Sequence, residues 1–479
     1  MAAGIAPSPV AAGTREIIDG LAARARAAQA AIADYTQAQT NTLVTAVAWA
    51  CYRTDRASAL AQLAIEDTGL GRYEDKVIKN RRKTFGTLRD LLDPSAVSVG
   101  VIDEDPATGI QRIAKPVGIV AALCPSTNPS ATPTNKTMMA LKGRNAVILA
   151  PSPKGASTCA KLLEYIHAEL DRIGAPRDLV QMLPAPISKE LTQTLMRAVD
   201  LVVVTGSQGN VRSAYSSGTP AIGVGAGNVP VIVDASANLA DAAAKISRSK
   251  TFDYATSCSS ENSLVILDRV YDATLDALRH EGGYLLDATQ KAQLSNALFL
   301  AGGKLSEKII AQSPRQIAKE AGFTDQAAHE ASFFLVEEDG VGDEHPFSGE
   351  KLCVALTLYR AADFDAALAR VQQILDYSGA GHSCGIHTAD AAHAQRLADT
   401  TRVVRVLVNQ SHCFNNGGGF DNGLDFTLSM GCGTWAGNSI SENLSYRHFL
   451  NITHLVRTIP AREPSEDELF GAYVKAYGA

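Results

Sequence analysis

Short, almost entirely apolar runs alternate with amphipathic stretches along most of this chain. The first five runs lie at 117–123, 145–150, 179–183, 200–204 and 230–233. A strand that is apolar on both faces has to be covered on both faces, which a parallel sheet between two layers of helices provides. The pattern therefore predicts a doubly wound α/β sheet, whose ligands bind at the carboxyl ends of its strands.

A second series with the same alternation follows and predicts a second α/β unit. Its expected strands lie at 263–268, 332–337, 353–358, 384–387 and 404–409. Residues 15–93, which precede both series, have the apolar spacing of helices.

Between those helices and the first series, two β-rich runs flank Asp105–Gly109 and predict a long hairpin. A hairpin this polar is not stable alone in water, so we expect it to pack on another domain or subunit, in a homodimer or homotetramer. The expected parts are a dinucleotide-binding domain at 15–98 and 116–236, a catalytic domain at 237–430, and an oligomerisation element at 99–115 and 445–460.

Composition narrows the function classes. The 479 residues carry 44 basic and 50 acidic side chains, a formal net charge of −6 without a basic stripe, which argues against binding to nucleic acid or to an anionic membrane. No apolar run approaches the roughly 18 residues of a membrane span, and residues 1–14 lack a secretory signal pattern. The eight cysteines are scattered without metal-ligand spacing. We therefore expect a cytoplasmic protein with reduced thiols and no metal.

A polar, glycine-containing turn follows one predicted strand of the first series. Thr205, Gly206 and Ser207 come directly after the strand at 200–204. Free N–H groups at a helix start bind dinucleotide phosphates, but a serine-capped helix start without a ligand fits the same residues. The spacing is not the G-x-G-x-x-G fingerprint, so both interpretations stay open.

One cysteine has unusual neighbours. Cys258 lies in the polar, hydroxyl-rich stretch 251–263, directly before a predicted strand. A cysteine that only fills a core normally has apolar neighbours. From these residues alone, a nucleophile and an inert structural thiol both stay open.

Five motifs in a fixed order then carry a family resemblance. The chain resembles the aldehyde dehydrogenase superfamily, and within it the acylating, CoA-dependent branch, from about residue 15 to 460. The motifs are CPSTNP at 124–129, LKGRNAVILAPSPK at 141–154, the glycine-containing run at 204–234, SKTFDYATSCSSEN at 249–262 and GCGTWAGNSISENL at 431–444.

The resemblance implies a role for individual residues. Cys258 matches the nucleophile that attacks the aldehyde carbonyl as a thiolate, and Asn128 matches the amide that holds the oxyanion. Glu350 matches the glutamate that holds the nicotinamide ribose, although Val354 stands where the family usually has proline. The remaining dinucleotide-binding residues that it implies are Ser152, Lys154, Thr205, Gly206, Ser207 and Gly225. Without the resemblance, Asn128 is as well explained as a turn residue and Glu350 as a surface glutamate.

One position differs from the hydrolytic members of the superfamily. They carry a Glu-Leu-Gly-Gly-Lys segment whose glutamate activates water against the thioester, and counting back from Pro230 places Val224 there. Valine cannot accept a proton, so the thioester should persist until the thiol of CoA attacks it. The alternatives are a hydrolytic dehydrogenase that releases a free acid, and an inactive dinucleotide-binding structural protein that kept the fold.

Cofactor and substrate are further expectations. The turn at 151–154 has a hydroxyl and an ammonium but no acid, which favours NADP over NAD. The substrate is expected to be a short anionic aldehyde, sulfoacetaldehyde first and succinate semialdehyde second, because polar groups surround Cys258. The residues expected to contact substrate or CoA are Thr256, Ser257, His382, His412 and Asn415. His382 could equally stabilise its loop, and Arg405 could equally be structural.

Overall fold

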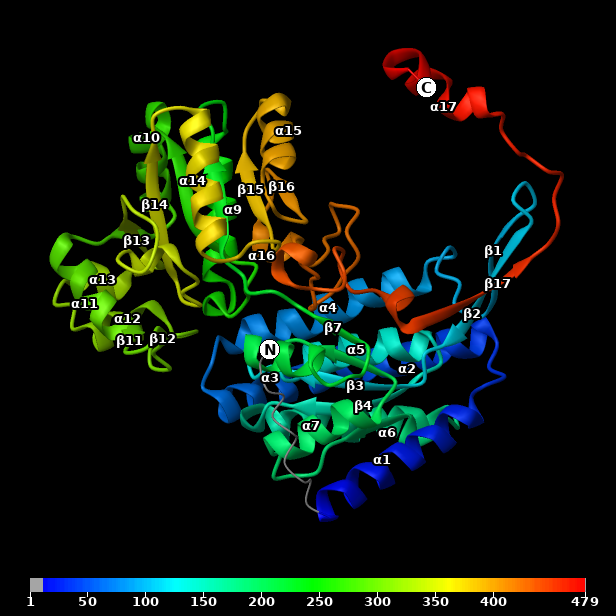
Figure 1. Cartoon of the computed structure of the whole chain (residues 1–479). Helices are drawn as coiled ribbons and strands as arrows, with labels where there is room; N and C mark the ends of the chain where they lie inside the picture. Colours follow the sequence, from blue (N-terminus) through cyan, green and yellow to red (C-terminus); the bar gives the residue numbers. More distant parts are fainter. Residues whose placement is uncertain (1–11, 479) are drawn as a thin grey trace.

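The computed structural model describes residues 12–478. They form two parallel sheets, a three-stranded antiparallel sheet and a two-stranded hairpin (Figure 1). The α/β fold class and the doubly wound first sheet are confirmed.

The first sheet has five parallel strands in the order β5-β4-β3-β6-β7. They are β3 (Ile119–Cys124), β4 (Ala146–Pro151), β5 (Val180–Met182), β6 (Leu201–Val204) and β7 (Ala221–Gly223). The chain runs outward from β3 to β5 and then returns to the other side of β3 for β6. The strand order therefore reverses between β3 and β6, at the point where ligands bind in sheets of this kind.

Helices cover both faces of this sheet, as its apolar strands require. Val120 and Ala122 of β3 pack into a core with α2, α5 and α6, whereas Ile119 and Ala121 pack into the opposite core with α1, α7 and α8. The helices of this half are α1 (Ala12–Ala31), α2 (Gln37–Tyr52), α3 (Thr54–Thr68), α4 (Tyr73–Leu92), α5 (Ala131–Lys142), α6 (Ala156–Arg172), α7 (Lys189–Ala198) and α8 (Gln208–Tyr215).

The second sheet has seven parallel strands in the order β10-β13-β14-β9-β8-β15-β16. They are β8 (Val229–Val233), β9 (Glu261–Leu267), β10 (Gly283–Leu285), β13 (Phe333–Glu337), β14 (Ala355–Ala361), β15 (Cys384–His387) and β16 (Val406–Val408). One core beneath it includes α9 to α12, and the opposite core includes α14 and α15. The helices of this half are α9 (Leu239–Thr251), α10 (Tyr271–His280), α11 (Ala288–Leu298), α12 (Pro314–Ala321), α13 (Gln326–Glu330), α14 (Phe364–Tyr377), α15 (Ala391–Thr400) and α16 (His412–Asn415).

The strand expected at 230–233 belongs to a different sheet from the one we predicted. It forms β8, which pairs with β9 and β15 inside the second sheet. The chain therefore passes between the two sheets at 224–228 rather than near 236. The prediction was wrong because an apolar run shows that a strand is buried on both faces, but not which strands lie beside it.

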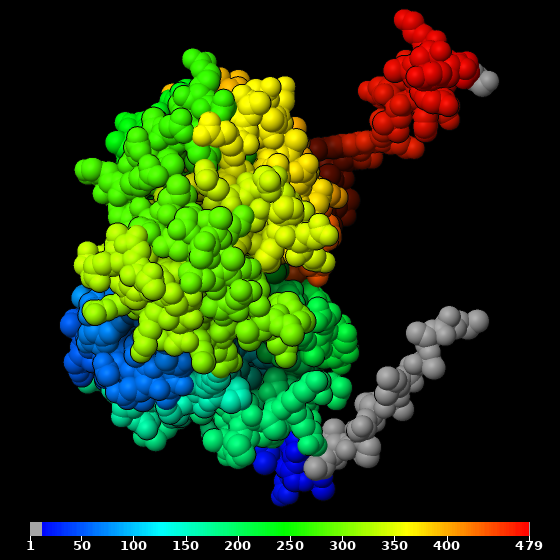
Figure 2. All heavy atoms as spheres, turned by 90° about the vertical axis from the view of Figure 1, so that its left-hand side faces the viewer, coloured from blue at the N-terminus to red at the C-terminus, as the bar shows by residue number. Residues whose placement is uncertain are grey.

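The predicted hairpin is confirmed as β1 (Gly100–Asp105) and β2 (Ile110–Pro116), which pair antiparallel. The tail strand β17 (Leu450–Val456) pairs along the whole of β2, so the hairpin and the tail form one sheet. Beyond β17 the chain leads to α17 (Glu466–Tyr477), which stands clear of the main body (Figures 1 and 2). A small hairpin of β11 (Phe299–Leu300) and β12 (Lys304–Leu305) completes the strands.

Candidate active site

Cys258 lies in the loop between α9 and β9, just after a strained turn. The turn is the 3-10 helix η3 (Phe252–Ala255), in which Asp253, Tyr254 and Ala255 have φ angles of 50°, 50° and 58°. Left-handed backbone at a non-glycine residue costs about 1–3 kcal/mol and persists only where the surroundings impose it. The position of Cys258 therefore depends on whatever fixes this turn.

The turn is fixed by the buried carboxylate of Asp253. It forms ion pairs with the ammonium groups of Lys76 and Lys79 from α4, and it accepts hydrogen bonds from the backbone N–H of Arg72 and the hydroxyl of Thr256. Asp253, Lys76 and Lys79 are all less than 7% exposed. Burial opposes ionisation of this carboxyl, but Lys79 and Lys76 outweigh it and hold the pKa of Asp253 below its usual range. Helix α4 thus anchors the loop of Cys258.

Two small cavities meet at the residue before Cys258. Ser257 lines both of them. The first also contains Cys258, Glu350 and Lys250, and the second contains Asn128 with a ring of aromatic and basic side chains. The loop at 225–227 packs directly on Cys258, because a Cβ on Gly227 would lie 2.6 Å from the Cβ of Cys258. The thiol, the amide of Asn128 and the carboxyl of Glu350 are therefore grouped around one short segment.

Asn128 and the backbone of Cys258 both offer hydrogen-bond donors there. The Asn128 amide donates only a long bond, 3.5 Å, to the hydroxyl of Thr127. No acceptor for the backbone N–H of Cys258 is found within residues 12–478. Two donors without strong partners beside a cysteine form an arrangement that stabilises an oxyanion on a carbonyl under attack.

Burial favours the protonated forms of both the Cys258 thiol and the Glu350 carboxyl. Burial, followed by the nearby Glu350, raises the pKa of Cys258 to about 12. Burial also raises the pKa of Glu350 to about 8, although Lys250 and Lys351 oppose the rise. Neighbouring Glu261 has a pKa raised to about 7, again by burial. A positive charge placed in this cavity would shift the thiol towards the reactive thiolate.

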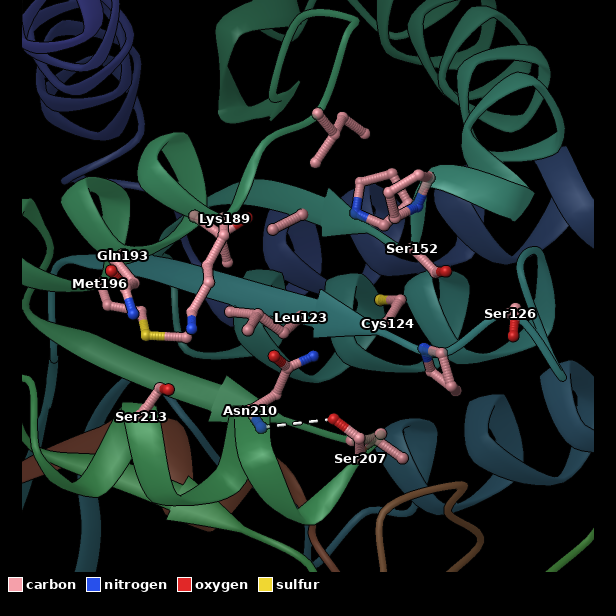
Figure 3. Close-up of a pocket in the computed structure, with 18 of the residues that line it drawn as sticks. Leu123, Cys124, Ser126, Ser152, Lys189, Gln193, Met196, Ser207, Asn210 and Ser213 are labelled. Atoms are coloured by element: carbon pink, nitrogen blue, oxygen red, sulfur yellow. Dashed lines mark hydrogen bonds between the residues drawn. The ribbon is translucent and has the colours of Figure 1, made fainter. Parts of the chain in front are cut away.

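A larger cavity of about 430 Å³ opens at the carboxyl ends of β3, β4 and β6 (Figure 3). Ser152, Thr205, Gly206 and Ser207 line it. The Ser207 hydroxyl accepts the Asn210 N–H at 3.3 Å and caps α8, so the serine-cap interpretation of this turn holds together with a cavity at the helix start. Lys189, at the start of α7, extends into the same cavity. A helix N-terminus, several hydroxyls and an ammonium fit the phosphates and riboses of a dinucleotide.

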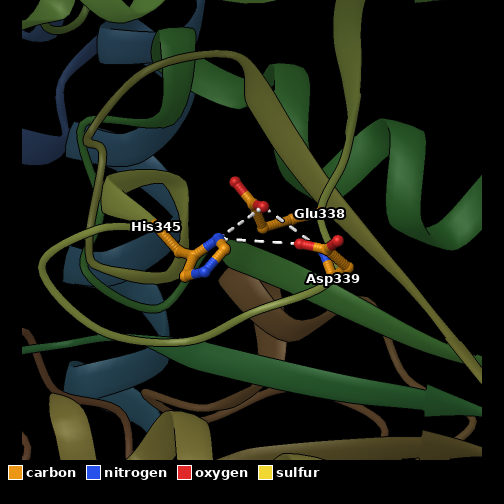
Figure 4. A group of neighbouring side chains, drawn as sticks. All are labelled: Glu338, Asp339 and His345. Atoms are coloured by element: carbon orange, nitrogen blue, oxygen red, sulfur yellow. Dashed lines mark hydrogen bonds and ion pairs between the residues drawn. The ribbon is translucent and has the colours of Figure 1, made fainter.

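One group of side chains outside these cavities has the composition of a metal site. Glu338, Asp339 and His345 bring ligand atoms within 4.8 Å of one another (Figure 4). Glu338 accepts from His345 at 2.8 Å and pairs with Lys291 at 3.1 Å, so its charge is already matched, and the Asp339 side chain is 94% exposed. We interpret this group as a surface ion-pair network, and the expectation of no metal stays a prediction.

Comparisons with known proteins identify the family. The model of the aldehyde dehydrogenase family matches residues 6–283. The acylating sulfoacetaldehyde dehydrogenase of Cupriavidus necator is 56% identical over 97% of this chain and 93% of its own. The acetylating succinate-semialdehyde dehydrogenase of Clostridium kluyveri is 35% identical over 95% of this chain and 99% of its own. The chain belongs to the aldehyde dehydrogenase family.

A solved structure agrees with this placement. The acetylating aldehyde dehydrogenase of Geobacillus thermoglucosidasius has a TM-score of 0.90 at 33% identity, with 95% of this chain and 99% of that chain covered. The predicted acylating branch of the aldehyde dehydrogenases is therefore confirmed, and with it an oxidoreductase that uses a nicotinamide cofactor and CoA. Within residues 12–478 no helix is long and apolar enough to cross a membrane.

Within this aldehyde dehydrogenase, three of the residues predicted to bind the cofactor, Lys154, Gly225 and Glu350, do not line the larger cavity. Lys154 forms an ion pair with Glu307 at 2.8 Å, and its side chain is 54% exposed. Gly225 lies against Cys432, whose sulfur would be 3.0 Å from a Cβ at position 225. Ser152, Thr205, Gly206 and Ser207 line the larger cavity, whereas Glu350 lines the small cavity that contains Cys258.

Most of the residues predicted to contact substrate or CoA do not line the two small cavities. Thr256 donates to Asp253 and belongs to the anchor of the turn. The rings of His382 and His412 both contact the Ser383 hydroxyl, at 2.8 and 3.0 Å. Asn415 donates to Gln410 and Asp421 and lines neither small cavity. Of this set only Ser257 lines the cavities, whereas the buried ring nitrogen Nε2 of His382 has no hydrogen-bond partner among residues 12–478.

The position at which hydrolytic members carry the glutamate directly precedes the loop that packs on Cys258. Val224 is buried, and its carbonyl accepts from the side chain of Gln208 at 3.3 Å. It immediately precedes the loop at 225–227 that packs on Cys258. Among the described residues, the cavity lined by Cys258 contains one carboxyl group, that of Glu350.

Sequence reasoning missed the charged residues that surround Cys258. Lys250, Asp253 and Glu261 are close to it in the sequence, and charged side chains so near a nucleophile were a signal that could have been used. Lys79 and Arg82 of α4 carried no such signal, because only the fold brings that helix to the loop of Cys258.

Proposed function

We propose that this acylating aldehyde dehydrogenase oxidises a short anionic aldehyde, sulfoacetaldehyde, to its CoA thioester, with NADP as hydride acceptor. The observation that carries the reaction type is a cysteine grouped with two oxyanion donors in a site where position 224 is valine. The relative from Cupriavidus necator, at 56% identity, supports sulfoacetaldehyde over succinate semialdehyde, for which the relative from Clostridium kluyveri is 35% identical.

The first half of the reaction forms a thioester on the enzyme. The Cys258 thiolate attacks the aldehyde carbon, a C–S bond forms and the carbonyl oxygen becomes an oxyanion. The Asn128 amide and the Cys258 N–H donate to that oxygen, and a donor of this kind is typically worth about 2.7–4 kcal/mol in the transition state. When the carbonyl re-forms, the C–H bond breaks with both its electrons, and Cys258 carries the thioester.

The dinucleotide supplies the acceptor for that hydride. The residues that would hold it are those lining the large cavity, with Ser207 and the start of α8 near its phosphates and Glu350 near the nicotinamide end. Glu350 lines the same small cavity as Cys258, so a ribose held by its carboxyl would lie beside the reacting carbon.

The second half transfers the acyl group to CoA. The CoA thiolate attacks the thioester, the new C–S bond forms, and Cys258 leaves as a thiolate. Sulfur replaces sulfur, so the exchange is nearly balanced in free energy. General-base help to water is typically worth about 10²–10⁴-fold, and Val224 provides none, so hydrolysis should be slow by comparison.

The choice of NADP rests on one hydroxyl and one ammonium group that line the larger cavity. Ser152 lines the cavity in a turn without an acidic residue, and Lys189 replaces Lys154 as the ammonium that faces it. Both groups would bind a ribose phosphate through charge-assisted hydrogen bonds. Lys189→Ala should reduce kcat/KM for NADP more than for NAD, whereas Lys154→Ala should not. A higher kcat/KM for NAD than for NADP in the unmodified enzyme would refute the choice.

We also propose a cytoplasmic homo-oligomer. The chain leads from β17, in the sheet with β1 and β2, to α17, in which no residue is buried. The side chains of Leu469, Phe470 and Tyr473 on this helix are each about 60% exposed. An apolar helix face that stands clear of its own chain is suited to bind a second copy. Light scattering on the full chain and on the double variant Phe470→Ser/Tyr473→Ser tests this, and an unchanged molar mass would count against α17 as the contact.

The deciding experiment follows reduced cofactor and product together. With sulfoacetaldehyde and NADP but no CoA, one burst of NADPH per active site should appear and then nearly stop. Adding CoA should restore turnover and yield an acyl-CoA. Sustained release of free acid without CoA would place the enzyme in the hydrolytic class, and equal efficiency with propanal would exclude an anionic substrate.

A further inference from the structure

Arg82 of α4 is a partly buried cation without a matching anion. Its guanidinium lines the small cavity that also contains Asn128 and Ser257. Within residues 12–478 it forms no ion pair or hydrogen bond, and its Nε atom is fully buried without a partner. Leaving a buried donor of a charged group unsatisfied is expensive, so a ligand that supplied the missing partner would gain binding energy here.

Aromatic rings hold Arg82 in this position. Its guanidinium carbon lies 4.8 Å from the ring centre of Phe420, and 5.7 and 5.8 Å from those of Phe414 and Phe426. Rings of this kind orient a guanidinium through cation–π contacts without neutralising it. Arg82 is therefore positioned but keeps its full charge.

A second guanidinium shares one of these rings. The Arg248 guanidinium lies 4.3 Å from the centre of Phe414, and within the described residues it too forms no ion pair or hydrogen bond. Burial and the charge of Arg248 both lower the pKa of Arg82, and the exposed Asp421 opposes this only in part. The positive charges of Arg82 and Arg248 repel each other across this ring, and an anion bound between them would offset the repulsion.

The other cations near the cavity are already occupied. Lys76 and Lys79 share the single carboxylate of Asp253, and Lys83 donates to the carbonyl of Gly417 at 2.8 Å. Arg405, the other arginine near Cys258, donates to Asn416, Asn443 and the carbonyl of His382. Among the described residues on this side of Cys258, Arg82 and Arg248 thus differ from these cations in having no hydrogen-bond acceptor or ion-pair partner.

We propose that Arg82, assisted by Arg248, binds the anionic head group of the aldehyde, a sulfonate or a carboxylate. This deepens the proposed function and rests on it. Arg82 shares its cavity with the oxyanion donor Asn128 and with Ser257, so an aldehyde whose carbonyl lies at Cys258 would direct a charge one or two carbons away towards α4. A planar guanidinium donates two parallel hydrogen bonds to either kind of oxyanion.

Arg82→Gln removes the charge and keeps a polar side chain. We expect kcat/KM for sulfoacetaldehyde to fall by about 10–150-fold, the usual range for a lost hydrogen bond to a charged group, mainly through KM. The rate with propanal, which has no charge, should change by less than about threefold. Arg82→Lys should recover part of the loss. Equal losses for both aldehydes, or no loss for either, would overturn the proposal.

Arg81 provides the matched control. It is the neighbouring residue on α4, and its guanidinium lies 4.9 Å from the ring centre of Tyr52 and donates to that residue's hydroxyl. It does not line the cavity. Arg81→Gln should leave the ratio of sulfoacetaldehyde to propanal efficiency unchanged, and a similar loss in this variant would show only a general effect of charge on α4.

Alkylation of Cys258 tests the anion site without any aldehyde. Iodoacetate carries a carboxylate and iodoacetamide does not, so Arg82 should raise the ratio of their rates at Cys258. Arg82→Gln should lower that ratio about tenfold, and Arg81→Gln should not change it. If the unmodified enzyme oxidises no anionic aldehyde but the ratio still depends on Arg82, the proposed substrate fails while the anion site stands. A ratio that is the same in all three proteins overturns the anion site itself.

Discussion

Replacing Asp253 by asparagine should destabilise the catalytic half of the protein more than any surface substitution. The change keeps the size of the side chain but leaves Lys76 and Lys79 buried without a counter-charge. Removing one partner of a buried ion pair typically costs about 3–5 kcal/mol. For a domain of 150–250 residues, that corresponds to a fall in melting temperature of roughly 6–20 °C.

Backbone strain is not the source of this loss. Asparagine adopts left-handed backbone more readily than most residues, so the new side chain would accept the φ of 50° that Asp253 has. The expected loss is therefore electrostatic. It should be nearly constant from neutral pH down to about pH 5 and shrink below about pH 4, because the stabilisation from a depressed pKa is complete above the unfolded pKa and is lost as the pH falls through the lower pKa of the folded state.

Thermal unfolding of the two proteins measures the effect, and Asp241→Asn is the control. Asp241 pairs with Lys245 one turn along α9, at the surface, so its loss should cost no more than about 0.5 kcal/mol. A fall in melting temperature below about 2 °C for Asp253→Asn, or one equal to that of the control, would refute the idea that this carboxylate holds the turn of Cys258.

Three further outcomes are expected. Cys258→Ala should abolish aldehyde oxidation, whereas Cys159→Ala, which removes an inert thiol from the core of the first sheet, should leave most of it; steady-state NADPH formation measures both. The rate of Cys258 alkylation by iodoacetamide in the free enzyme should rise about tenfold per pH unit between pH 7 and 9, because its pKa is raised to about 12; a plateau below pH 8 would contradict this. Glu350→Gln should increase that alkylation rate at pH 9, since it removes a negative charge that raises the pKa of Cys258, and a decrease would show that Glu350 acts as the base for the thiol.

The strands could be predicted because burial on both faces leaves a direct mark on composition. The residues of β3 from Ile119 to Leu123 alternate between two cores, so this part of the strand has no polar position, and the sequence shows this without any knowledge of the fold. The sheet to which β8 belongs could not be predicted in the same way. Its neighbours β9 and β15 follow it in the sequence, and pairing depends on contacts that an apolar run does not encode.

The sequence was enough to single out Cys258, but the contacts that hold its loop could not be predicted. The resemblance and the polar stretch both directed attention to Cys258, and the structure groups it with Asn128 around Ser257. The left-handed turn before it depends on a contact between Asp253 and Lys79, 174 residues apart. Sequence patterns describe local periodicity, so an anchor between such distant segments, and likewise the position of Arg82, becomes visible only in the fold.

The raised pKa of Cys258 has consequences for both halves of the reaction. In the free enzyme burial keeps the thiol protonated, so attack on the aldehyde should await a positive charge in the cavity, such as that of the oxidised nicotinamide ring. In the second half Cys258 must leave as a thiolate, and a thiol with a lower pKa leaves faster. Arg405 is the permanent cation that lowers the pKa of Cys258, and three acceptors fix its guanidinium in place. The same cysteine can therefore be protected from adventitious reaction before the cofactor binds and still be released when CoA attacks.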